Sequence, residues 1–333
     1  MNSTVTDLPE ELRLALARDA AGVPTERLRA AVGRLVTAYR SGTPPESPVL
    51  AGDVEAAAYA AYRMPATFAA VRAALSTVPG GFAPASLTDV GGGTGAAAWA
   101  AAAAYPTLGQ VTVLDQSGPA LRRGVLLAAG AAHHALRQAR WRQAGLVPAP
   151  DLPAADLVTV SYVLGELPDA ARWPLVEAAA GAGGVLVIVE PGTPAGYARV
   201  IEARERLLAL GQRVLAPCPH PLACPLAVGD WCHFGARVNR SALHRRLKDA
   251  DLGYEDEKFS YLATVAPGVG PEPAAAGSGR VLRRPVQRKG LVALRLCRPD
   301  GTAGERLVSR RDAALYRLAR DASWGGAFPA GPQ

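Results

Sequence analysis

The sequence predicts an α/β protein built on a doubly wound, mainly parallel sheet, with helices before the sheet and an irregular cysteine-rich segment after it. Three observations favour this class. Strand-like and helical runs alternate between residues 86 and 210, a glycine-rich loop follows the first strand-like run, and all four cysteines come after residue 217. A parallel strand needs a crossover, usually a helix, before the next strand can pair with it. The alternation therefore indicates a parallel sheet.

Length and composition bound the class of protein. The chain has 333 residues, enough for two domains or one domain with additions, and its 49% hydrophobic and 20% charged residues exclude a wholly disordered chain. The longest apolar run, Ala96–Tyr105, is about half the roughly 20 residues that a membrane-spanning helix needs. The first residues include Asp7 and Glu10 and no apolar stretch, so we expect no signal or transit peptide. The bias towards Arg, Ala, Gly and Pro is typical of GC-rich genomes. We expect a soluble bacterial protein of the cytoplasm, monomeric and without contact to a membrane.

The chain divides into four expected regions: a helical cap at 1–80, a sheet core at 81–215, a cysteine-rich loop at 216–239, and C-terminal strands with a basic segment at 240–333. In the cap, Leu28, Val32 and Leu35 recur at helical spacing, and the same pattern at Tyr59–Leu75 is broken by Pro65.

The pattern of the core and the C-terminal region predicts individual elements. The expected core strands are Ser86–Val90, Val111–Asp115, Leu157–Val163 and Gly184–Glu190. The expected core helices are Gly95–Tyr105, Pro119–Gln143 (with a break near His133 or a short third strand), Asp169–Ala180 and Pro194–Leu210. For the C-terminal region we expect a helix at Arg240–Asp249, a mobile loop at Pro267–Gly279, a last helix at Arg310–Asp321, and an antiparallel strand pair formed by Tyr254–Val265 and Leu291–Cys297.

The glycine-rich loop predicts a nucleotide-like ligand. Glycines allow a sharp turn and close approach of a ligand, and free N–H groups at the start of the following helix face its polar end. Asp115 ends the second strand, where a carboxylate can accept hydrogen bonds from both ribose hydroxyls. Read as G-x-G-x-x-A (Gly91, Gly93, Ala96), the loop also suits a dinucleotide.

An acid two residues before the first glycine favours a different ligand. Asp89 followed by G-x-G-x-G fits the motif of class I methyltransferases, whose donor is S-adenosylmethionine, and the expected closing antiparallel strands suit their sheet. The core at 81–215 is therefore expected to bind this donor. The candidate donor-binding residues are Asp89, Gly91, Gly93, Gly95, Asp115 and Ser161. The alternative is a tight strand–helix turn that holds no ligand.

The end of the fourth strand, Ser161–Pro168, is where a methyl acceptor would meet the donor. It lacks the Asn/Asp-Pro-Pro-aromatic tetrad common in amino-directed enzymes. A cytosine-C5 enzyme needs a cysteine nucleophile, and residues 1–217 contain none. The catalytic residue is therefore unassigned. Glu166 and Glu190 are candidate general bases, although carboxylates at strand ends equally often orient ligands or cap helices.

The cysteines predict a metal centre. Cys218, Cys224, Cys232 and Cys297 supply four thiolates, which suit either tetrahedral zinc or an iron–sulfur cluster. The spacing lacks the paired C-x-x-C knuckles of common zinc sites. Substitution of a thiolate by His220 or His233 keeps zinc open, and four unligated buried cysteines are the remaining alternative.

Positive charge is concentrated near the C-terminus. Residues 280–320 contain twelve Arg or Lys and three acids, whereas the net charge of the whole chain is +7. Such a segment attracts phosphate backbones, although it also fits a solvated basic surface. The candidate RNA-binding residues are Arg280, Arg283, Arg284, Arg288 and Lys289.

Together these pieces resemble the methyltransferase-like family associated with the small ribosomal subunit, known from mitochondria and with bacterial relatives. The matching stretches are Tyr62–Phe68, Asp89–Gly95, Leu164–Leu167, Glu190–Thr193, Cys218–Cys224, Asp230–Phe234, Glu257–Tyr261 and Arg283–Cys297. The resemblance covers roughly residues 55–325, and the cysteine pattern makes it specific.

The resemblance implies a class I methyltransferase fold that binds S-adenosylmethionine, carries a 4Fe–4S cluster on the four cysteines, and acts on the small ribosomal subunit and its rRNA during assembly or translation. It leaves two alternatives open: an rRNA methyltransferase, or an assembly factor that keeps only the donor pocket. A radical enzyme that uses cluster and donor together is more remote, because its compact C-x₃-C-x₂-C loop is missing. We expect the cluster to be mainly structural, since ligation of Cys297 ties the basic segment to the cysteine-rich loop.

Overall fold

The computed structural model describes residues 6–40, 50–248, 252–272 and 277–329. The α-helices are α1 Glu10–Ala21, α2 Thr25–Arg40, α3 Asp53–Tyr62, α4 Met64–Leu75, α5 Ala96–Ala104, α6 Gly118–Ala128, α7 His134–Arg137, α8 Asp169–Ala182, α9 Pro194–Ala209, α10 Ala242–Lys248 and α11 Ala313–Asp321; a 3₁₀ turn, η1, covers Leu164–Glu166. None of these helices has the length and apolar character that crossing a membrane requires.

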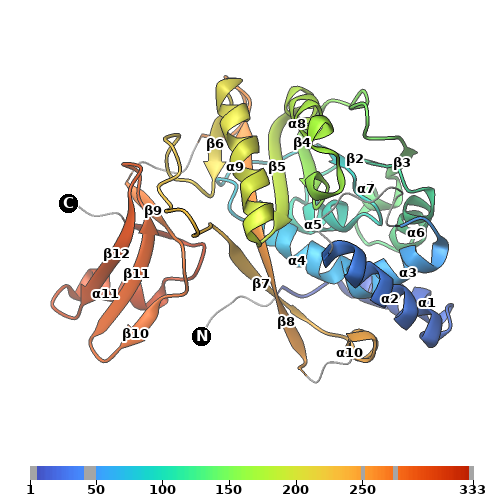
Figure 1. Ribbon diagram of the computed structural model, residues 1–333, viewed down its shortest axis with the longest axis horizontal. Helices are drawn as coiled ribbons and strands as arrows, with labels where there is room; N and C mark the ends of the chain where they lie inside the picture. The colour runs from blue at the N-terminus through green and yellow to red at the C-terminus, as the bar shows by residue number, and fades with distance from the viewer. Residues whose placement is uncertain (1–5, 41–49, 249–251, 273–276, 330–333) are drawn as a thin grey trace.

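The main sheet runs through the centre of the molecule (Figure 1). Its strands are β1 Ser86–Val90, β2 Gln110–Asp115, β3 Arg140–Gln143, β4 Ala155–Ser161, β5 Gly183–Pro191, β6 Arg213–Ala216, β7 Phe234–Asn239 and β8 Tyr254–Val265. The order is β3-β2-β1-β4-β5-β8-β6, with β7 paired to β8. The strands from β1 to β5 are parallel, and β8 is antiparallel to β5, β6 and β7.

This strand order is that of a class I methyltransferase. The order of the five parallel strands reverses between β1 and β4, and the antiparallel strand β8 lies between β5 and β6. The point where the strand order reverses is where doubly wound sheets bind ligands, beyond the carboxyl ends of the strands. The sheet therefore presents the end of β1 and the end of β4 to the same site.

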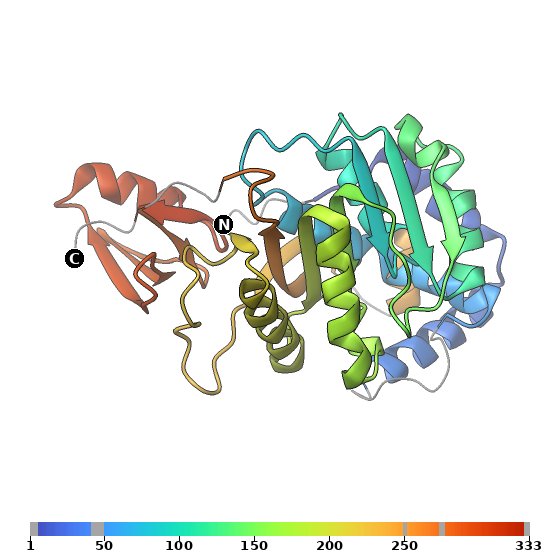
Figure 2. The ribbon, with the colours of Figure 1, turned by 90° about the horizontal axis from the view of Figure 1, so that it is seen from above.

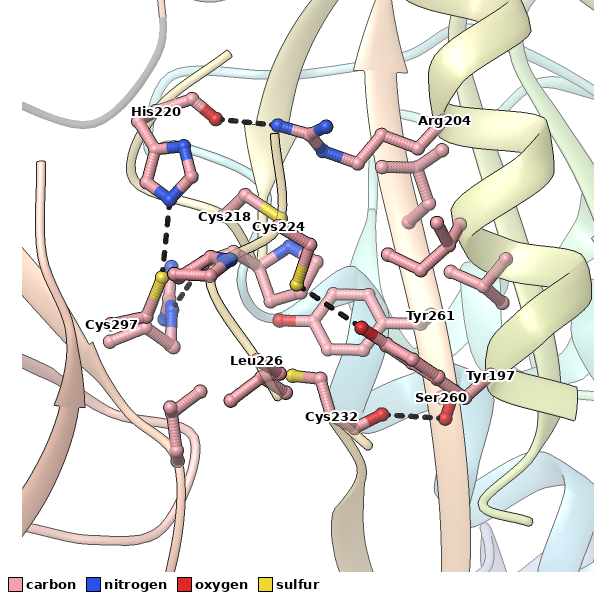
Figure 3. Close-up of a pocket in the computed structure, with 17 residues that line it drawn as sticks. Tyr197, Arg204, Cys218, His220, Cys224, Leu226, Cys232, Ser260, Tyr261 and Cys297 are labelled. Atoms are coloured by element: carbon pink, nitrogen blue, oxygen red, sulfur yellow. Dashed lines mark hydrogen bonds between the residues drawn. The ribbon is translucent and has the colours of Figure 1, made fainter. Parts of the chain in front are cut away.

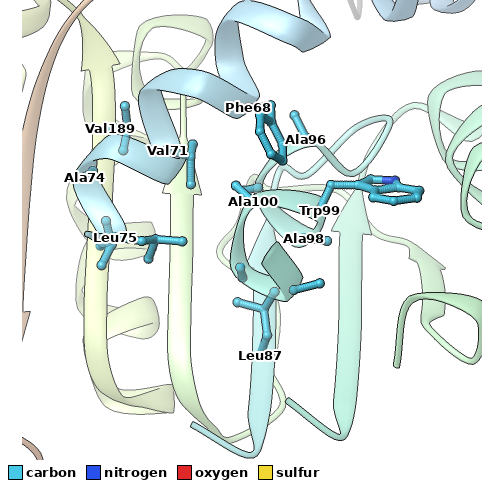
Figure 4. Close-up of a cluster of buried hydrophobic side chains, with 14 of the residues drawn as sticks. Phe68, Val71, Ala74, Leu75, Leu87, Ala96, Ala98, Trp99, Ala100 and Val189 are labelled. Atoms are coloured by element: carbon cyan, nitrogen blue, oxygen red, sulfur yellow. The ribbon is translucent and has the colours of Figure 1, made fainter. Parts of the chain in front are cut away.

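Both faces of the sheet are buried. Successive side chains of β5 point to opposite faces, and those on both faces are apolar. Val185, Val187 and Val189 belong to the core beneath α4 and α5, whereas Leu186 and Ile188 belong to the core beneath α8 and α9. Helix α5 is almost entirely alanine, which combines high helix propensity with a small cross-section. Figure 4 shows the result: Phe68 of α4 lies close to α5 and the sheet.

The helical cap, α1–α4, packs on the main sheet through α4 and on α6 through α1 and α3. Pro65 stands in the first turn of α4, where a missing N–H costs nothing, and Arg63 forms the break between α3 and α4. Leu28, Val32 and Leu35 of α2 pack with alanines of α3 and with Leu247 of α10. The expected break in the helical pattern falls at Arg63, two residues before Pro65, which lies inside the first turn of α4.

A second, smaller sheet lies to one side of the main sheet in both ribbon views (Figures 1 and 2). Its strands are β9 Ser278–Val281, β10 Val286–Arg288, β11 Leu291–Cys297, β12 Ala303–Ser309 and β13 Ala327–Pro329. β11 pairs with β10, β12 and β9, and α11 packs on this sheet through Leu315, Tyr316 and Ala319. We call β9–β13 with α11 the C-terminal sheet.

The core strands and helices are confirmed to within about two residues, except that the expected helix Pro119–Gln143 is α6, α7 and the short strand β3. The predicted pairing of Tyr254–Val265 with Leu291–Cys297 is wrong. β8 completes the main sheet and β11 lies in the C-terminal sheet, because the turn around Gly301 folds β12 back onto β11. Asp249, at the end of one expected helix, and residues 273–276 of the expected loop lie outside the described residues.

Replacement of Phe68 by alanine tests the core. Phe68 is 1% exposed, and the cavity left by Phe68→Ala should lower the free energy of unfolding by about 3–5 kcal/mol. Urea unfolding measures this loss. The control Leu126→Ala, at a side chain that is 65% exposed, should change it by less than about 0.5 kcal/mol. Equal effects of the two variants would contradict the assigned core.

Candidate functional site

The glycine loop between β1 and α5 needs glycine for two physical reasons. Gly91 and Gly95 have φ of +67° and +85°, a region that residues with a Cβ rarely adopt. A Cβ on Gly91 would also stand 2.3 Å from Val163 Cγ2, and one on Gly95 would stand 2.6 Å from Trp141. The loop is therefore packed against Val163, after β4, and against Trp141 of β3.

Asp89 is held inside the protein at the end of β1. It is fully buried, its Oδ1 accepts a hydrogen bond from Thr159 at 2.8 Å, and its Oδ2 has no partner among the described residues. Burial, together with the charge of nearby Asp115, raises the pKa of Asp89 to about 7. A buried acceptor without a partner costs free energy, so this oxygen favours a donor from a ligand or a water molecule.

Asp115 and Ser161 lie at the same edge of the sheet, at the ends of β2 and β4. Asp115 accepts hydrogen bonds from the backbone N–H of Gly93 at 2.8 Å and of Ser117 at 2.7 Å. A carboxylate has about four acceptor positions, so it can still accept from a ribose. Ser161 Oγ is buried and has no partner within the described part of the chain. We call Asp89, Gly91–Gly95, Asp115 and Ser161 the glycine-loop site.

Sequence reasoning missed a polar network beside this site. Arg63 forms two hydrogen bonds to the carboxylate of Glu257, at 2.8 and 2.6 Å, and Tyr162 Oη donates to the same carboxylate at 2.9 Å. The Arg63 guanidinium also lies 4.9 Å from the centroid of the Tyr162 ring. These residues come from the cap, β8 and the end of β4. Two of them stand in matching stretches, but no sequence signal gave them a role.

Tyr162 is held in an unusual backbone conformation. Its φ of +61° is positive, which no other non-glycine residue in the described ranges shows. Such strain costs about 1–3 kcal/mol and persists only where the surroundings enforce it. Here the backbone N–H of Tyr162 donates to Val189 O at 2.7 Å, and the hydroxyl is fixed by Glu257. The strained residue directly follows Ser161, at the expected acceptor end of β4.

The two candidate bases differ in their surroundings. Glu190 is fully buried, and its two oxygens accept from Leu164 N at 3.0 Å and Arg199 Nε at 2.7 Å, so both are occupied. Glu166 accepts no hydrogen bond from the described residues. Burial, together with the charges of Asp115 and Glu190, raises the pKa of Glu166 to about 8. Of the two, only Glu166 keeps a carboxyl group free to exchange a proton near neutral pH.

All four cysteines line one cavity, between α9, β8 and the C-terminal sheet (Figure 3). Cys218 and Cys224 come from the irregular loop after β6, Cys232 precedes β7, and Cys297 ends β11. Cys224 Sγ lies 3.1 Å from Tyr197 Oη, and Cys297 Sγ lies 3.3 Å from His220 Nε2. Segments up to 79 positions apart in the chain therefore bring their thiols to a common space.

The thiols of this cavity are in a low-dielectric environment. Burial raises the pKa of Cys218 and of Cys232, and it raises that of Cys297 to about 12. The neighbouring sulfurs contribute to these raised values, so without a cation Cys218, Cys232 and Cys297 stay protonated. A bound metal reverses this balance and deprotonates a coordinating thiol.

Two arginines line the cysteine cavity, the buried Arg204 and the partly buried Arg280. Arg204 is 2% exposed and donates to the carbonyls of His220 at 3.0 Å and Leu222 at 2.6 Å, while its Nε has no partner. Arg280 donates to Pro217 O at 2.9 Å and Gly325 O at 2.8 Å. Within the described ranges neither arginine pairs with a carboxylate. Both therefore carry positive charge that the surrounding protein leaves uncompensated.

The four thiols are a ligand set that fits a tetrathiolate metal centre, whereas the side-chain conformations are not those of a metal site. Among the described residues, no three His, Cys, Asp or Glu side chains stand close enough to share a metal ion. The cavity measures about 30 Å³, room for one or two water molecules. A cluster would need the cysteine side chains to turn. The metal in the expected insertion is therefore not shown.

The five candidate RNA-binding residues divide into two groups. Arg280 belongs to the cysteine cavity, Arg283 pairs with Asp230, and Arg284 pairs with Asp256 at 2.9 Å. Arg288, which ends β10, and Lys289, in the turn between β10 and β11, are exposed.

Further exposed cations lie around that turn. Arg310 N donates to Gly290 O at 3.1 Å, and Gln287 Nε2 donates to Arg320 O at 2.8 Å, so three segments meet here. We call the exposed residues Arg288, Lys289, Arg310, Arg311, Arg317 and Arg320 the basic end of the C-terminal sheet. It stands at the start of β11, and Cys297 stands at the other end of that strand, about 20 Å away by strand geometry.

The buried acids predict how stability depends on pH. The pKa values of Asp89 and Glu166, about 7 and 8, exceed the ordinary values of 3.8 and 4.5, so the folded protein keeps protons that the unfolded chain releases. The free energy of unfolding should therefore fall as pH rises from about 5 to 8, by at most about 1.4 kcal/mol per pH unit for each group. Urea unfolding across this range measures it. Glu166→Gln should flatten the fall and the exposed Glu202→Gln should not; stability that rises with pH would contradict the assignment.

Comparison with known proteins extends this description. The chain is 30% identical to the human mitochondrial ribosome assembly protein METTL17 over 291 residues, which cover 81% of this chain and 62% of the relative. It is 26% identical to the mitochondrial Rsm22-cox11 tandem protein 2 of Schizosaccharomyces pombe over 185 residues, 44% of this chain and 25% of the relative. The chain thus matches less than two thirds of the length of these relatives.

A solved structure is similar at a lower level. Magnesium protoporphyrin IX methyltransferase of Synechocystis PCC 6803, determined with bound S-adenosylmethionine, matches 60% of this chain and 77% of its own chain at 15% identity, with a TM-score of 0.38. The fold assignment rests on the strand order given above and not on this likeness.

The relatives correct one expectation. A bacterial cytoplasmic location was expected from the arginine-rich composition and the first residues, but the matching relatives are described as mitochondrial, and that expectation is wrong. Composition and the start of a chain do not report its compartment. A family model described as mitochondrial small ribosomal subunit Rsm22 matches residues 53–329, most of the chain. With this match and the METTL17 likeness, the chain belongs to the Rsm22 family.

Proposed function

We propose that this protein binds the small ribosomal subunit and acts in its assembly, with S-adenosylmethionine at the glycine-loop site and a 4Fe–4S cluster on the four cysteines. The description of the family names the small subunit, and the name of the human relative names ribosome assembly. The observation that carries the proposal is the placement of β11. One end of this strand brings Cys297 to the other three cysteines, and its other end carries the basic end.

The glycine-loop site has the groups that S-adenosylmethionine needs. The unpartnered Asp89 Oδ2 and Ser161 Oγ are buried acceptors at the carboxyl edge of the sheet, and Asp115 is placed to accept from a ribose. When bound, the donor supplies an electrophilic methyl group. The protein's own contribution is to orient it between the ends of β1, β2 and β4 and to hold acidic groups near its positive charge.

The cysteine cavity favours a dianionic centre over neutral thiols. Arg204 and Arg280 place two uncompensated cations beside the sulfurs, which offsets the charge of four thiolates around iron. When bound, the cluster supplies a crosslink between the loop at 217–232 and the end of β11. Zinc is the alternative, with His220 as a replacement ligand because it lies 3.3 Å from Cys297 Sγ.

The basic end is the part of the C-terminal sheet best suited to rRNA. Its six cations are exposed, whereas Arg280, Arg283 and Arg284 are engaged within the protein. Exposed cations gain most from phosphate contact, because they release counterions without breaking an existing ion pair. The monomeric state stays a prediction.

One observation favours methyl transfer to rRNA as a second candidate function. Glu166 keeps a carboxyl group without a hydrogen-bond partner in the described ranges, and its raised pKa suits proton uptake near neutral pH. Incubation of immature small subunits with methyl-labelled donor distinguishes the two functions. Label in rRNA with the wild type but not with Asp89→Ala supports an enzyme. Subunit binding without label supports an assembly factor.

Donor binding should depend on Asp115. Asp115→Ala removes the acceptor for the ribose and the contact to Gly93 N, and we expect at least tenfold weaker binding of S-adenosylmethionine by isothermal titration calorimetry. The exposed Asp151→Ala serves as the matched control and should bind as the wild type does. Wild-type protein that binds no donor would remove this part of the proposal.

Subunit binding should depend on the basic end. Arg310→Glu combined with Arg311→Glu should weaken binding to small subunits about tenfold or more and lower the slope of log K against log salt by about two. Arg18→Glu combined with Arg245→Glu, two exposed positions near the helical cap, is the charge-matched control. Sedimentation binding at several salt concentrations measures both. An equal loss in the two double variants would mean that only net charge matters.

A further inference from the structure

A groove lies outside the cysteine cavity, between the start of α9 and the loop before β7. It measures about 350 Å³ and is lined by Pro194, Tyr197, Leu226, Val228, Asp230 and Trp231. This volume is within the range of small-molecule sites in proteins. Tyr197 and Leu226 line both this groove and the cysteine cavity, whereas none of the donor-binding residues and none of the cysteines lines the groove.

Two aromatic side chains of the groove are held in place by contacts from behind. The Trp231 indole N–H donates to Gly192 O at 3.0 Å, and the ring stacks on His233 with centroids 5.3 Å apart and planes inclined by 26°. The Tyr197 hydroxyl forms a hydrogen bond with Cys224 Sγ at 3.1 Å. Both rings are only partly buried. A flat ligand that stacks on fixed rings avoids much of the entropy cost of ordering them.

The rim of the groove is positive. Asp230 is shared between Arg283 and Arg295, the latter at 3.0 Å, so this carboxylate balances only one of two guanidinium groups. Flat aromatic rings next to surplus arginine charge suit a ligand that combines a planar base with a phosphate.

We propose that this groove holds an unstacked base of single-stranded RNA, with the backbone phosphates on the side of Arg283 and Arg295. The proposal rests on the proposed contact with rRNA and adds a base-binding site to the basic end. Proteins commonly bind splayed bases by stacking on Tyr and Trp, whereas a duplex keeps its bases inaccessible. The groove therefore predicts a preference for single strands that the basic end alone does not give.

Val228 offers a test that spares the fold. It lines the groove and is fully exposed, so Val228→Asp adds a negative charge there without disturbing a core. Val269→Asp makes the same change at an exposed valine that does not line the groove. Tyr197→Ala removes a stacking ring, and Tyr197→Phe keeps the ring while removing the bond to Cys224. Thermal unfolding identifies any variant that fails to fold.

The probe is a fluorescein-labelled 12-nucleotide single-stranded RNA, with the duplex of the same sequence for comparison, and anisotropy measures binding. We expect Val228→Asp and Tyr197→Ala to weaken single-strand binding about tenfold and to bind the duplex within about twofold of the wild type. The controls Val269→Asp and Tyr197→Phe should bind the single strand within about twofold of the wild type. Photo-crosslinking with 4-thiouridine in the same RNA should attach to Tyr197 or to residues 226–231.

Three outcomes would overturn the inference. Single-strand affinity unchanged in Val228→Asp and Tyr197→Ala, with small-subunit binding intact, would refute the base site and leave the proposed function standing. Equal losses of affinity for single strand and duplex would mean that the groove contributes only charge and does not bind a base. An apolar peptide that binds the groove and is not displaced by single-stranded RNA would assign the groove to a protein partner. A wild type that binds neither RNA nor subunits would instead contradict the proposed function itself.

Discussion

The arrangement of the molecule depends on how the irregular loop at 217–233 satisfies its backbone. The loop forms no helix or strand, so its carbonyls need other partners. Arginines supply them from both sides: Arg204 of α9 binds two carbonyls, Arg280 of β9 binds Pro217 O, and Arg283 binds Trp231 O at 3.1 Å. The loop therefore joins the main sheet to the C-terminal sheet, and it brings its cysteines to the point where the two meet.

Strand β8 connects the two candidate sites. Glu257 joins Arg63 and Tyr162 beside the glycine-loop site, and three residues later Ser260 donates to Cys232 O at 2.7 Å and lines the cysteine cavity. One site holds acids that burial keeps partly protonated, and the other holds thiols beside unpaired arginines. Their charges are opposite. The first suits a cationic ligand such as a sulfonium, whereas the second suits an anionic centre.

The sequence was sufficient for the core but not for the C-terminal sheet. Parallel strands such as β4 and β5 are long apolar runs, and the glycine loop between β1 and α5 has a local signature, so periodicity found both. Short strands such as β9 and β10 carry little pattern, and the choice of partner for β11 is set by tertiary packing.

The cysteines were recognised by residue type. Arg204 was not, because a buried arginine bound to carbonyls looks like any other helical arginine until the loop folds over it. The Tyr162 backbone likewise depends on Glu257 and Arg63, which are distant in sequence.

The proposed function places one iron–sulfur cluster on the four cysteines, at the junction of the two sheets. The most direct test is the content of iron, acid-labile sulfide and zinc per chain in protein purified without oxygen, together with Cys218→Ser and His220→Gln. We expect about four irons and four sulfides in the wild type and in His220→Gln, and loss of both in Cys218→Ser. One zinc without sulfide, or no metal at all, would contradict the claim and leave the loop held by its arginines alone.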